Sequence, residues 1–180
     1  MFWIGVFGSG TVTPENPLYE QAELLGKAIA EAGWVVLNGG YGGIMEAVSK
    51  GAIAAGGTVI GITTSWLKKR QPNPYLSREI TAPTYLQRLE RLVLSADAAV
   101  VFPGGSGTML EIAALLTLME RRFLDEERPI VFFSDFWRPW LQLLQDQGII
   151  ATVPPRIQFV NTIDPIIPFL QQCFQTHHSS

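Results

Sequence analysis

The residues best suited to chemistry lie in the segment 98–111, where an apolar run leads through a glycine-rich turn into a predicted helix. Residues 98–102 show no polar alternation, which predicts a strand buried on both faces of a sheet. The helix is expected to begin at about Thr108. Free glycine amides and the positive end of the helix dipole then face one point, which favours an anion such as phosphate. We expect Glu111 in the first turn of this helix, beside any bound phosphoester, so the segment predicts chemistry on a nucleotide.

Two further glycine-rich turns follow predicted strands. Residues 39–43 read Gly-Gly-Tyr-Gly-Gly after the apolar run 34–38, and Gly8-Ser-Gly10 follows the run 4–7. One glycine-rich turn is weak evidence for a ligand, because many such turns only connect a strand to a helix. Three of them at the carboxyl ends of parallel strands are stronger evidence, since doubly wound sheets bind ligands along that edge.

Each candidate side chain also has a purely structural interpretation. Thr108 and Glu111 have the spacing of a capping box, so Glu111 is either a cap, a catalytic group, or both. Arg88 is expected in the first turns of its helix, where it faces the same crevice or pairs with a neighbour such as Glu90. Four hydroxyls could donate to phosphate or be ordinary turn residues, namely those of Ser9, Thr11, Ser106 and Thr108.

Strands and helices are expected to alternate along the chain. Strands are predicted at residues 2–7, 34–37, 58–62, 79–82, 98–102, 130–133 and 157–160. Helices are predicted from Asn16-Pro17 to Gly33, over 44–55, from Thr84, from about Thr108, over 137–145 and over 165–174. The pattern predicts one α/β domain over residues 1–176, a Rossmann-like doubly wound parallel sheet with helices on both faces, and a polar tail at 177–180. Residues 63–77 are expected to form an exposed linker or a lid.

Composition excludes several classes of partner. The 180 residues carry 13 Lys and Arg against 16 Asp and Glu, a net charge of −3, so we expect no nucleic-acid partner. The start Met1-Phe-Trp-Ile lacks the basic region of a signal peptide, and no apolar run approaches the roughly 20 residues that span a bilayer. We therefore expect a cytoplasmic protein without membrane association. The single Cys173 excludes an internal disulfide.

Several common catalytic and cofactor sites lack their residues. Both histidines, His177 and His178, lie in the polar tail, so neither a Ser-His-Asp triad nor a zinc cluster is expected. No lysine follows a glycine-rich turn as a Walker A motif requires, and Gly8-Ser-Gly10 lacks the third glycine of a dinucleotide motif. We expect no metal and no cofactor.

The chain resembles the LONELY GUY (LOG) family of cytokinin riboside 5′-monophosphate phosphoribohydrolases, which are often labelled lysine decarboxylases. The resemblance covers about residues 4–119 and rests on Arg88, on Pro103-Gly-Gly-x-Gly-Thr-x-x-Glu111, and on Gly-Gly-x-x-Gly-Ile-Met upstream. A decarboxylase using pyridoxal needs a Schiff-base lysine, for which this sequence offers no candidate outside helix surfaces and loops.

The resemblance implies a Rossmann-like homodimer that hydrolyses a nucleoside 5′-monophosphate to free base and ribose 5-phosphate. It places the catalytic arginine and glutamate on Arg88 and Glu111. The residues expected to bind phosphate or nucleotide are Gly8, Ser9, Gly39, Gly40, Gly43, Met45, Gly104, Gly105, Ser106, Gly107 and Thr108. Three positions depart from the family pattern, Glu46, Leu89 and Ser106, and a neighbouring branch carries molybdenum cofactor without hydrolysis. A carrier protein for a phosphorylated cofactor is therefore the alternative. Exposed aromatic residues at Trp66, Trp137 and Trp140 would favour the homodimer.

Overall fold

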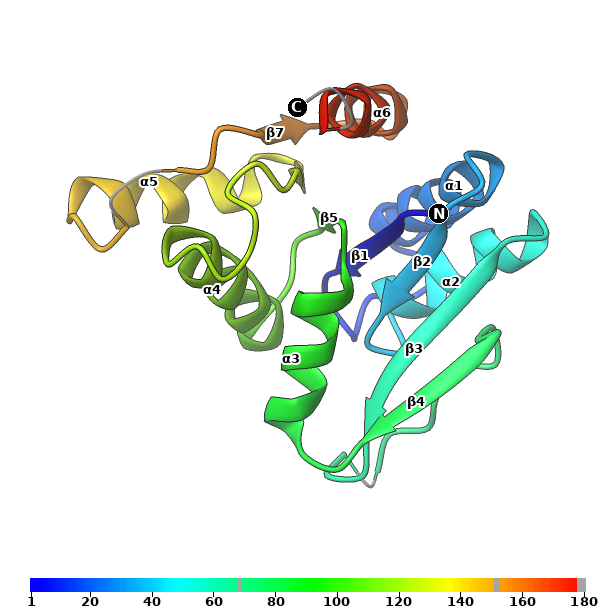
Figure 1. Ribbon diagram of the computed structural model, residues 1–180. Coiled ribbons are helices and arrows are strands. Elements are labelled where there is room, and N and C mark those ends of the chain that lie inside the picture. The colour runs from blue at the N-terminus through cyan, green and yellow to red at the C-terminus, as the bar shows by residue number, and fades with distance from the viewer. Residues whose placement is uncertain (68, 151–152, 178–180) are drawn as a thin grey trace.

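A seven-stranded, all-parallel sheet organises the chain in the order β4-β3-β2-β1-β5-β6-β7 (Figure 1). The computed structural model describes residues 1–67, 69–150 and 153–177. The strands are β1 (Trp3–Phe7), β2 (Val35–Asn38), β3 (Thr58–Thr64), β4 (Arg78–Ala82), β5 (Ala98–Val101), β6 (Ile130–Phe133) and β7 (Ile157–Val160). The strand order reverses between β1 and β5, where a doubly wound sheet opens a crevice for ligands.

Helices cover both faces of the sheet, as predicted (Figure 1). One face packs against α1 (Pro17–Glu31), α2 (Ile44–Ala54) and α6 (Ile166–His177). The other packs against α3 (Tyr85–Ser95), α4 (Ser106–Glu120) and α5 (Arg138–Asp146), which a short 3₁₀ turn η1 (Asp135–Trp137) precedes. Alternate residues of β1 show the division: Ile4 and Val6 belong to the first core, and Phe7 belongs to the second. The chain is thus a single Rossmann-like α/β domain.

Two predicted helix starts are confirmed. The Asn16 side chain accepts a hydrogen bond from the Leu18 amide at 2.9 Å, with Pro17 as the first helical residue of α1. The Thr84 hydroxyl accepts from the Gln87 amide at 3.1 Å at the start of α3. Both caps fix where a helix leaves the sheet edge, which matters for α3 because it carries Arg88.

The start of α4 differs from the prediction. The helix begins at Ser106 rather than about Thr108, and its N-cap is Gly105, which makes no side-chain cap bond. Ser106 and Gly107 therefore form its first turn, and Glu111 lies in the second turn. The expected capping box of Thr108 and Glu111 is wrong for this reason.

Of two tryptophans expected at the surface, Trp137 belongs to the second core and Trp140 is partly buried against it. Trp137 is buried in the second core and its indole N–H donates to the Phe102 carbonyl at 3.0 Å. Trp140 packs edge-on against it, with ring centroids 5.8 Å apart. Of these three tryptophans, only Trp66 is largely exposed. Exposed tryptophans therefore do not support the predicted homodimer interface.

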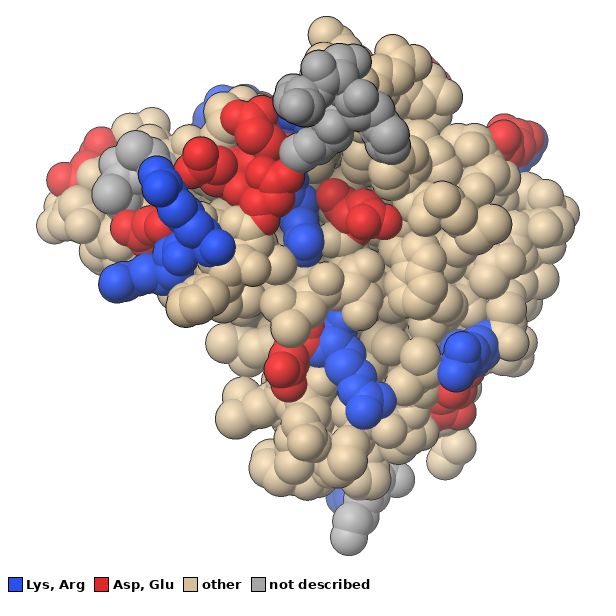
Figure 2. Space-filling view, viewed as in Figure 1, with Lys and Arg blue, Asp and Glu red and all other residues tan. Residues whose placement is uncertain are grey.

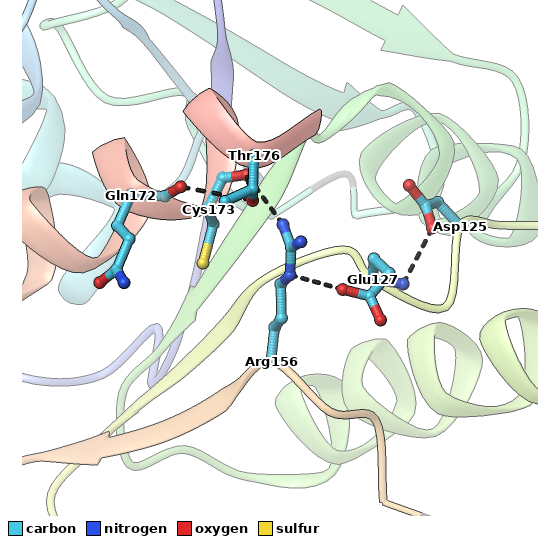
Figure 3. A network of polar contacts seen from close by, with 6 residues as sticks. All are labelled: Asp125, Glu127, Arg156, Gln172, Cys173 and Thr176. Atoms are coloured by element: carbon cyan, nitrogen blue, oxygen red, sulfur yellow. Dashed lines mark hydrogen bonds and ion pairs between the residues drawn. The ribbon is translucent and has the colours of Figure 1, made fainter. Parts of the chain in front are cut away.

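Polar contacts attach α6 to the sheet edge (Figure 3). The Arg156 guanidinium donates to the Cys173 carbonyl at 2.8 Å and pairs with Glu127 at 2.7 Å. Within α6, the Thr176 hydroxyl donates to the same carbonyl at 2.9 Å. His177 ends α6, and the rest of the expected polar tail, including His178, lies outside the described residues.

On the face drawn in Figure 2, basic and acidic side chains form small groups that often lie beside one another. Figure 2 shows no continuous basic stripe on the face drawn. Within the described residues, no helix is long and apolar enough to cross a membrane, and no cluster of His, Cys, Asp and Glu could hold a metal ion.

Helices α1 and α2 approach each other through glycines. A Cβ at Gly26 would collide with the Val48 carbonyl oxygen and lie 2.9 Å from the Ala52 amide nitrogen. A Cβ at Gly51 would collide with the backbone of Glu23. Because these obstacles are backbone atoms, they cannot move aside as a flexible side chain can.

We expect Gly26→Ala to destabilise the protein by about 1–3 kcal/mol, because overpacking outweighs the roughly 1 kcal/mol that alanine gains in a helix. Urea denaturation measures the free energy of unfolding. Leu24→Ala, at an exposed position on the same helix, is the control and should change it by no more than about 0.5 kcal/mol. A Gly26→Ala protein as stable as the wild type would contradict this packing.

Candidate functional site

A cleft of about 310 Å³ lies at the carboxyl edge of the sheet, where the strand order reverses. The turns after β1, β2 and β5 and the first turns of α3 and α4 form its walls. Most predicted site residues line it, namely Gly8, Ser9, Gly39, Met45, Arg88, Gly105, Ser106, Gly107, Thr108 and Glu111. The sequence thus located the cleft, although the roles of its residues stay predictions.

Backbone hydrogen bonds through Ser9 join the three glycine-rich turns. The Ser9 amide donates to the Pro103 carbonyl at 3.0 Å, and the Ser9 carbonyl accepts from the Ile44 amide at 2.9 Å. The turn after β1 therefore lies between the other two, in the same order as their strands in the sheet.

Three predicted residues lie behind this surface and shape it. Gly40 and Gly43 have φ values of +76° and +69°, which non-glycine residues rarely adopt. Gly104 packs against the Thr108 side chain, where a Cβ would collide. These three glycines permit the turns but do not line the cleft.

Buried Asn38 fixes the turn after β2. Its side-chain oxygen accepts from the Gly40 amide at 2.7 Å, and its Nδ2 donates to the Ser49 hydroxyl at 2.9 Å. Sequence reasoning missed Asn38 as a supporting residue, although an asparagine that ends an apolar run just before glycines is a usable signal for such a turn.

The N-terminus of α4 presents the amides of the third turn to the cleft. The first amides of an α-helix have no partner within the helix, and the helix dipole adds partial positive charge there. Ser106 and Gly107 line the cleft at this point, and Thr108 is buried beside them. This end of the cleft is suited to a phosphate group.

Arg88 is held rigidly at the floor of the cleft. Its side chain is 5% exposed, its Nε donates to the Ile62 carbonyl at 2.7 Å, and its Nη2 donates to the Gly39 carbonyl at 3.1 Å. The guanidinium lies 5.5 Å from the ring centre of Tyr41 and 5.6 Å from that of Tyr85. The exposed arginine paired with Glu90 is therefore the wrong alternative. The two carbonyls take two of its five N–H donors, which leaves others for a ligand.

Glu111 is a buried carboxyl group that faces the cleft. It is 8% exposed, and among the described residues no hydrogen bond or ion pair holds its carboxylate. Burial raises the pKa of Glu111 to about 7, although the positive charge of Arg88 opposes the rise. A carboxyl group near neutrality in a cleft is typical of acid–base chemistry.

The segment between β3 and β4 closes one side of the cleft. Leu67 and Arg70 line the cleft, so the segment is not only a linker, and Lys68 lies outside the described residues. The Asn73 amide donates to the Gly40 carbonyl at 2.8 Å, which ties the segment to the turn after β2. Sequence reasoning missed three lining residues: Tyr41, which lies within the second glycine-rich turn, and Tyr85 and Arg70, which no motif marks.

Residues 1–147 match the sequence model of a protein family described as the SLOG cluster4 family. The chain belongs to the SLOG cluster4 family. The matched range includes all three glycine-rich turns, Arg88 and Glu111, so every residue that lines the cleft lies within it.

This SLOG cluster4 protein is similar to sequences named for an enzyme activity and to an uncharacterised one. It is 32% identical over 170 residues to a cytokinin riboside 5′-monophosphate phosphoribohydrolase of Mycobacterium marinum, covering 89% of this chain and 88% of that protein. It is 41% identical over 113 residues to an uncharacterised protein of Archaeoglobus fulgidus, covering 63% of this chain and 72% of that one.

Among solved structures, the molybdenum cofactor binding protein of Rippkaea orientalis has the same fold. The TM-score is 0.74 at 28% identity, and the match covers 96% of each chain. The chain is therefore similar in sequence to a relative named for hydrolysis and in structure to a protein named for binding a cofactor.

Replacing Glu111 should alter how stability depends on pH. The pKa of Glu111 in the folded protein, about 7, exceeds its ordinary value of 4.5, so the folded protein holds the proton where the unfolded chain releases it. The free energy of unfolding of the wild type therefore decreases as the pH rises from about 4.5 to 7. We expect the stability of Glu111→Gln, relative to that of the wild type, to increase by on the order of 2–3 kcal/mol as the pH rises from 4.5 to 8.

Denaturant titrations at several pH values measure this difference. Glu120→Gln, which removes an exposed carboxylate from the same helix, is the matched control and should track the wild type. A constant difference between Glu111→Gln and the wild type across this range would show that burial does not raise the pKa of Glu111.

Proposed function

We propose that this protein hydrolyses the N-glycosidic bond of a nucleoside 5′-monophosphate of the AMP or cytokinin riboside type, giving free base and ribose 5-phosphate. The observation that carries the proposal is the unpaired, buried carboxyl group of Glu111 in a cleft that also holds Arg88 and the N-terminus of α4. These elements provide a general base or charge stabiliser, a fixed cation and an anion site.

The 5′-phosphate would bind the free amides and hydroxyls at the start of α4. Ser106 and Thr108 offer hydroxyl groups, and the glycines allow a phosphate to approach the backbone. Binding the phosphate there would leave the ribose within the cleft near Arg88 and Glu111, and would exclude nucleosides that lack the phosphate.

Bond cleavage would transfer the C1′–N electron pair to the base and leave positive charge on the ribose ring. The carboxylate of Glu111 would stabilise that charge and orient a water molecule towards C1′. The water oxygen bonds to C1′, its proton passes to Glu111, and the departing base takes up a proton. Arg88 would hold the ribose phosphate and favour the ionised form of Glu111.

Relatives support the reaction type. The Mycobacterium marinum relative is named for hydrolysis of a cytokinin riboside monophosphate, and an Escherichia coli relative, 35% identical over 98 residues, is named a pyrimidine/purine nucleotide 5′-monophosphate nucleosidase. The match covers only 22% of that second protein. Of the three departures from the family pattern, only Ser106 lines the cleft, while Glu46 and Leu89 do not.

The second candidate is a carrier of a phosphorylated cofactor, because the structurally similar Rippkaea orientalis protein is named for molybdenum cofactor binding. The two candidates share the phosphate site and differ in the use of Glu111. A carrier needs no carboxylate whose pKa lies near neutrality, so the state of Glu111 favours hydrolysis.

The test is to incubate the protein with AMP or with N6-substituted AMP and to measure the free base released by chromatography. We expect kcat/KM to rise with pH through about 7, as Glu111 loses its proton. Glu111→Gln should bind AMP normally but lose on the order of 3–4 kcal/mol of transition-state stabilisation, a rate factor of several hundred.

Adenosine is the substrate control, since it lacks the phosphate and should bind much more weakly than AMP. Wild-type turnover by Glu111→Gln would refute the catalytic role of Glu111. Absence of free base from every nucleotide, together with tight binding, would favour the carrier.

We also infer a homodimer, with α3 and α4 at its interface. Between these helices lies an apolar groove in which Glu90 is the one charged lining residue. Leu86, Leu94 and Leu110 there are 67%, 46% and 40% exposed. Contiguous apolar patches of this kind mark interfaces, and a second copy offers the same surface about a two-fold axis.

Light scattering should therefore give twice the 19.9 kDa mass of one chain. Leu110→Asp should give the single-chain mass, because burying an unpaired carboxylate at the interface is unfavourable. Leu143→Asp, at an exposed position on α5, is the control and should remain dimeric. A wild-type monomer at micromolar concentration would contradict the dimer.

A further inference from the structure

The cleft contains a second arginine that the proposed reaction leaves without a role. Arg70 lies in the segment between β3 and β4 and lines the cleft together with Leu67. Its Nη1 lies 2.9 Å from the position that a Cβ on Gly10 would take, so its guanidinium reaches the turn after β1. Unlike Arg88, Arg70 is exposed.

The segment that carries Arg70 forms a local turn and is tied to the turn after β2 through Asn73. The Arg70 amide donates to the Leu67 carbonyl at 2.9 Å. Three residues further on, Asn73 donates from its amide to the Gly40 carbonyl and from its Nδ2 to the Tyr41 carbonyl, at 2.8 and 3.0 Å. Arg70 is therefore positioned at the cleft by backbone contacts and not only by its own side chain.

Arg70 lies away from the proposed phosphate site. The sheet order places β3, β2, β1 and β5 side by side, so the segment after β3 and the α4 N-terminus after β5 approach the cleft from opposite sides. The turn after β1 has the two groups at different ends. Gly104, next to the α4 N-terminus, packs against Gly8, whereas Arg70 lies beside Gly10.

The surroundings of Arg70 suit a planar base. The Met45 Cε lies 3.3 Å from the same Cβ position on Gly10, and Tyr41 and Leu67 line the cleft nearby. Aromatic, thioether and aliphatic groups form the usual walls of sites for flat, partly apolar ligands. With phosphate at one end and the ribose beside Glu111, the base falls at the Arg70 end.

We propose that Arg70 binds an acceptor atom on the base and stabilises the negative charge that develops there as the bond to C1′ breaks. The electron pair of that bond moves into the base ring, where a guanidinium donor lowers the energy of the departing anion. The role extends the proposed hydrolysis and rests on it. It also defines the substrate class as nucleotides whose base carries a ring-nitrogen acceptor, as purines do at N7.

Binding tests the location of Arg70 independently of catalysis. Calorimetry with AMP and with ribose 5-phosphate, which lacks the base, compares the wild type, Arg70→Ala and Lys69→Ala. We expect Arg70→Ala to weaken AMP binding by about tenfold or more and to leave ribose 5-phosphate binding unchanged. Lys69, an exposed cation that does not line the cleft, is the matched control and should behave as the wild type.

Rates test the charge that Arg70 stabilises. AMP methylated at N7 carries a positive base that departs as a neutral molecule and needs no cation beside it. Arg70→Ala should lower kcat/KM for AMP by about 10- to 100-fold. It should leave the rate on the methylated nucleotide unchanged or raise it.

Equal losses of affinity for AMP and ribose 5-phosphate would place Arg70 at the phosphate and overturn the proposal. Equal rate losses on AMP and on its methylated form would also overturn it. If no nucleotide releases base, the hydrolysis fails, and selective loss of AMP binding in Arg70→Ala would still support contact between Arg70 and the base.

Discussion

The buried guanidinium of Arg88 is the constraint on which the rest of the site depends. A buried cation is strongly unfavourable unless its N–H groups are paired, and here two backbone carbonyls, of Ile62 and Gly39, provide the pairing. A Cβ at Gly39 would collide with the guanidinium, so this glycine is required by the arginine rather than by its own backbone. The aromatic rings of Tyr41 and Tyr85 lie 5.5 and 5.6 Å from the guanidinium, which also faces the cleft. The turn after β2, the end of β3 and the start of α3 are thus fixed relative to one another by one side chain.

Glu111 shows how the site opposes the stability of the fold. A carboxyl group with only 8% exposure and no bonded partner is favoured in its neutral form, and Arg88 offsets only part of that preference. Buried polar side chains with a structural role are usually hydrogen-bonded, as the fully buried Asn38 is. The Glu111 carboxyl group instead faces the cleft, where a ligand could supply a partner.

The sequence predicted the parts of this structure that depend on local pattern. Apolar runs predicted most of the strands, and the side chains of Asn16 and Thr84 marked two helix starts correctly. The start of α4 was misplaced because glycine and serine are poor helix formers, although both are tolerated in a first turn whose amides bind other groups. The indole of Trp137 is buried through a contact with Phe102, 35 residues away. Tyr85 and Arg70 reach the cleft from different elements, and no motif records such a meeting.

The pairing of β1 with β5 has a consequence for how the protein forms during synthesis. Phe7 lies opposite Val101 in this ladder, and at its other end the Trp3 amide donates to the Asp97 carboxylate at 2.7 Å. Arg88 and the first two turns precede β5 in the chain, whereas the α4 N-terminus and Glu111 follow it. A nascent chain from which only β1 to β4 have emerged can pair these four strands. It still lacks Arg88, Glu111 and the α4 N-terminus, so it cannot form the cleft. Closing this contact between segments 94 residues apart is entropically unfavourable and slow, so the cleft is completed only after β5 has joined the sheet.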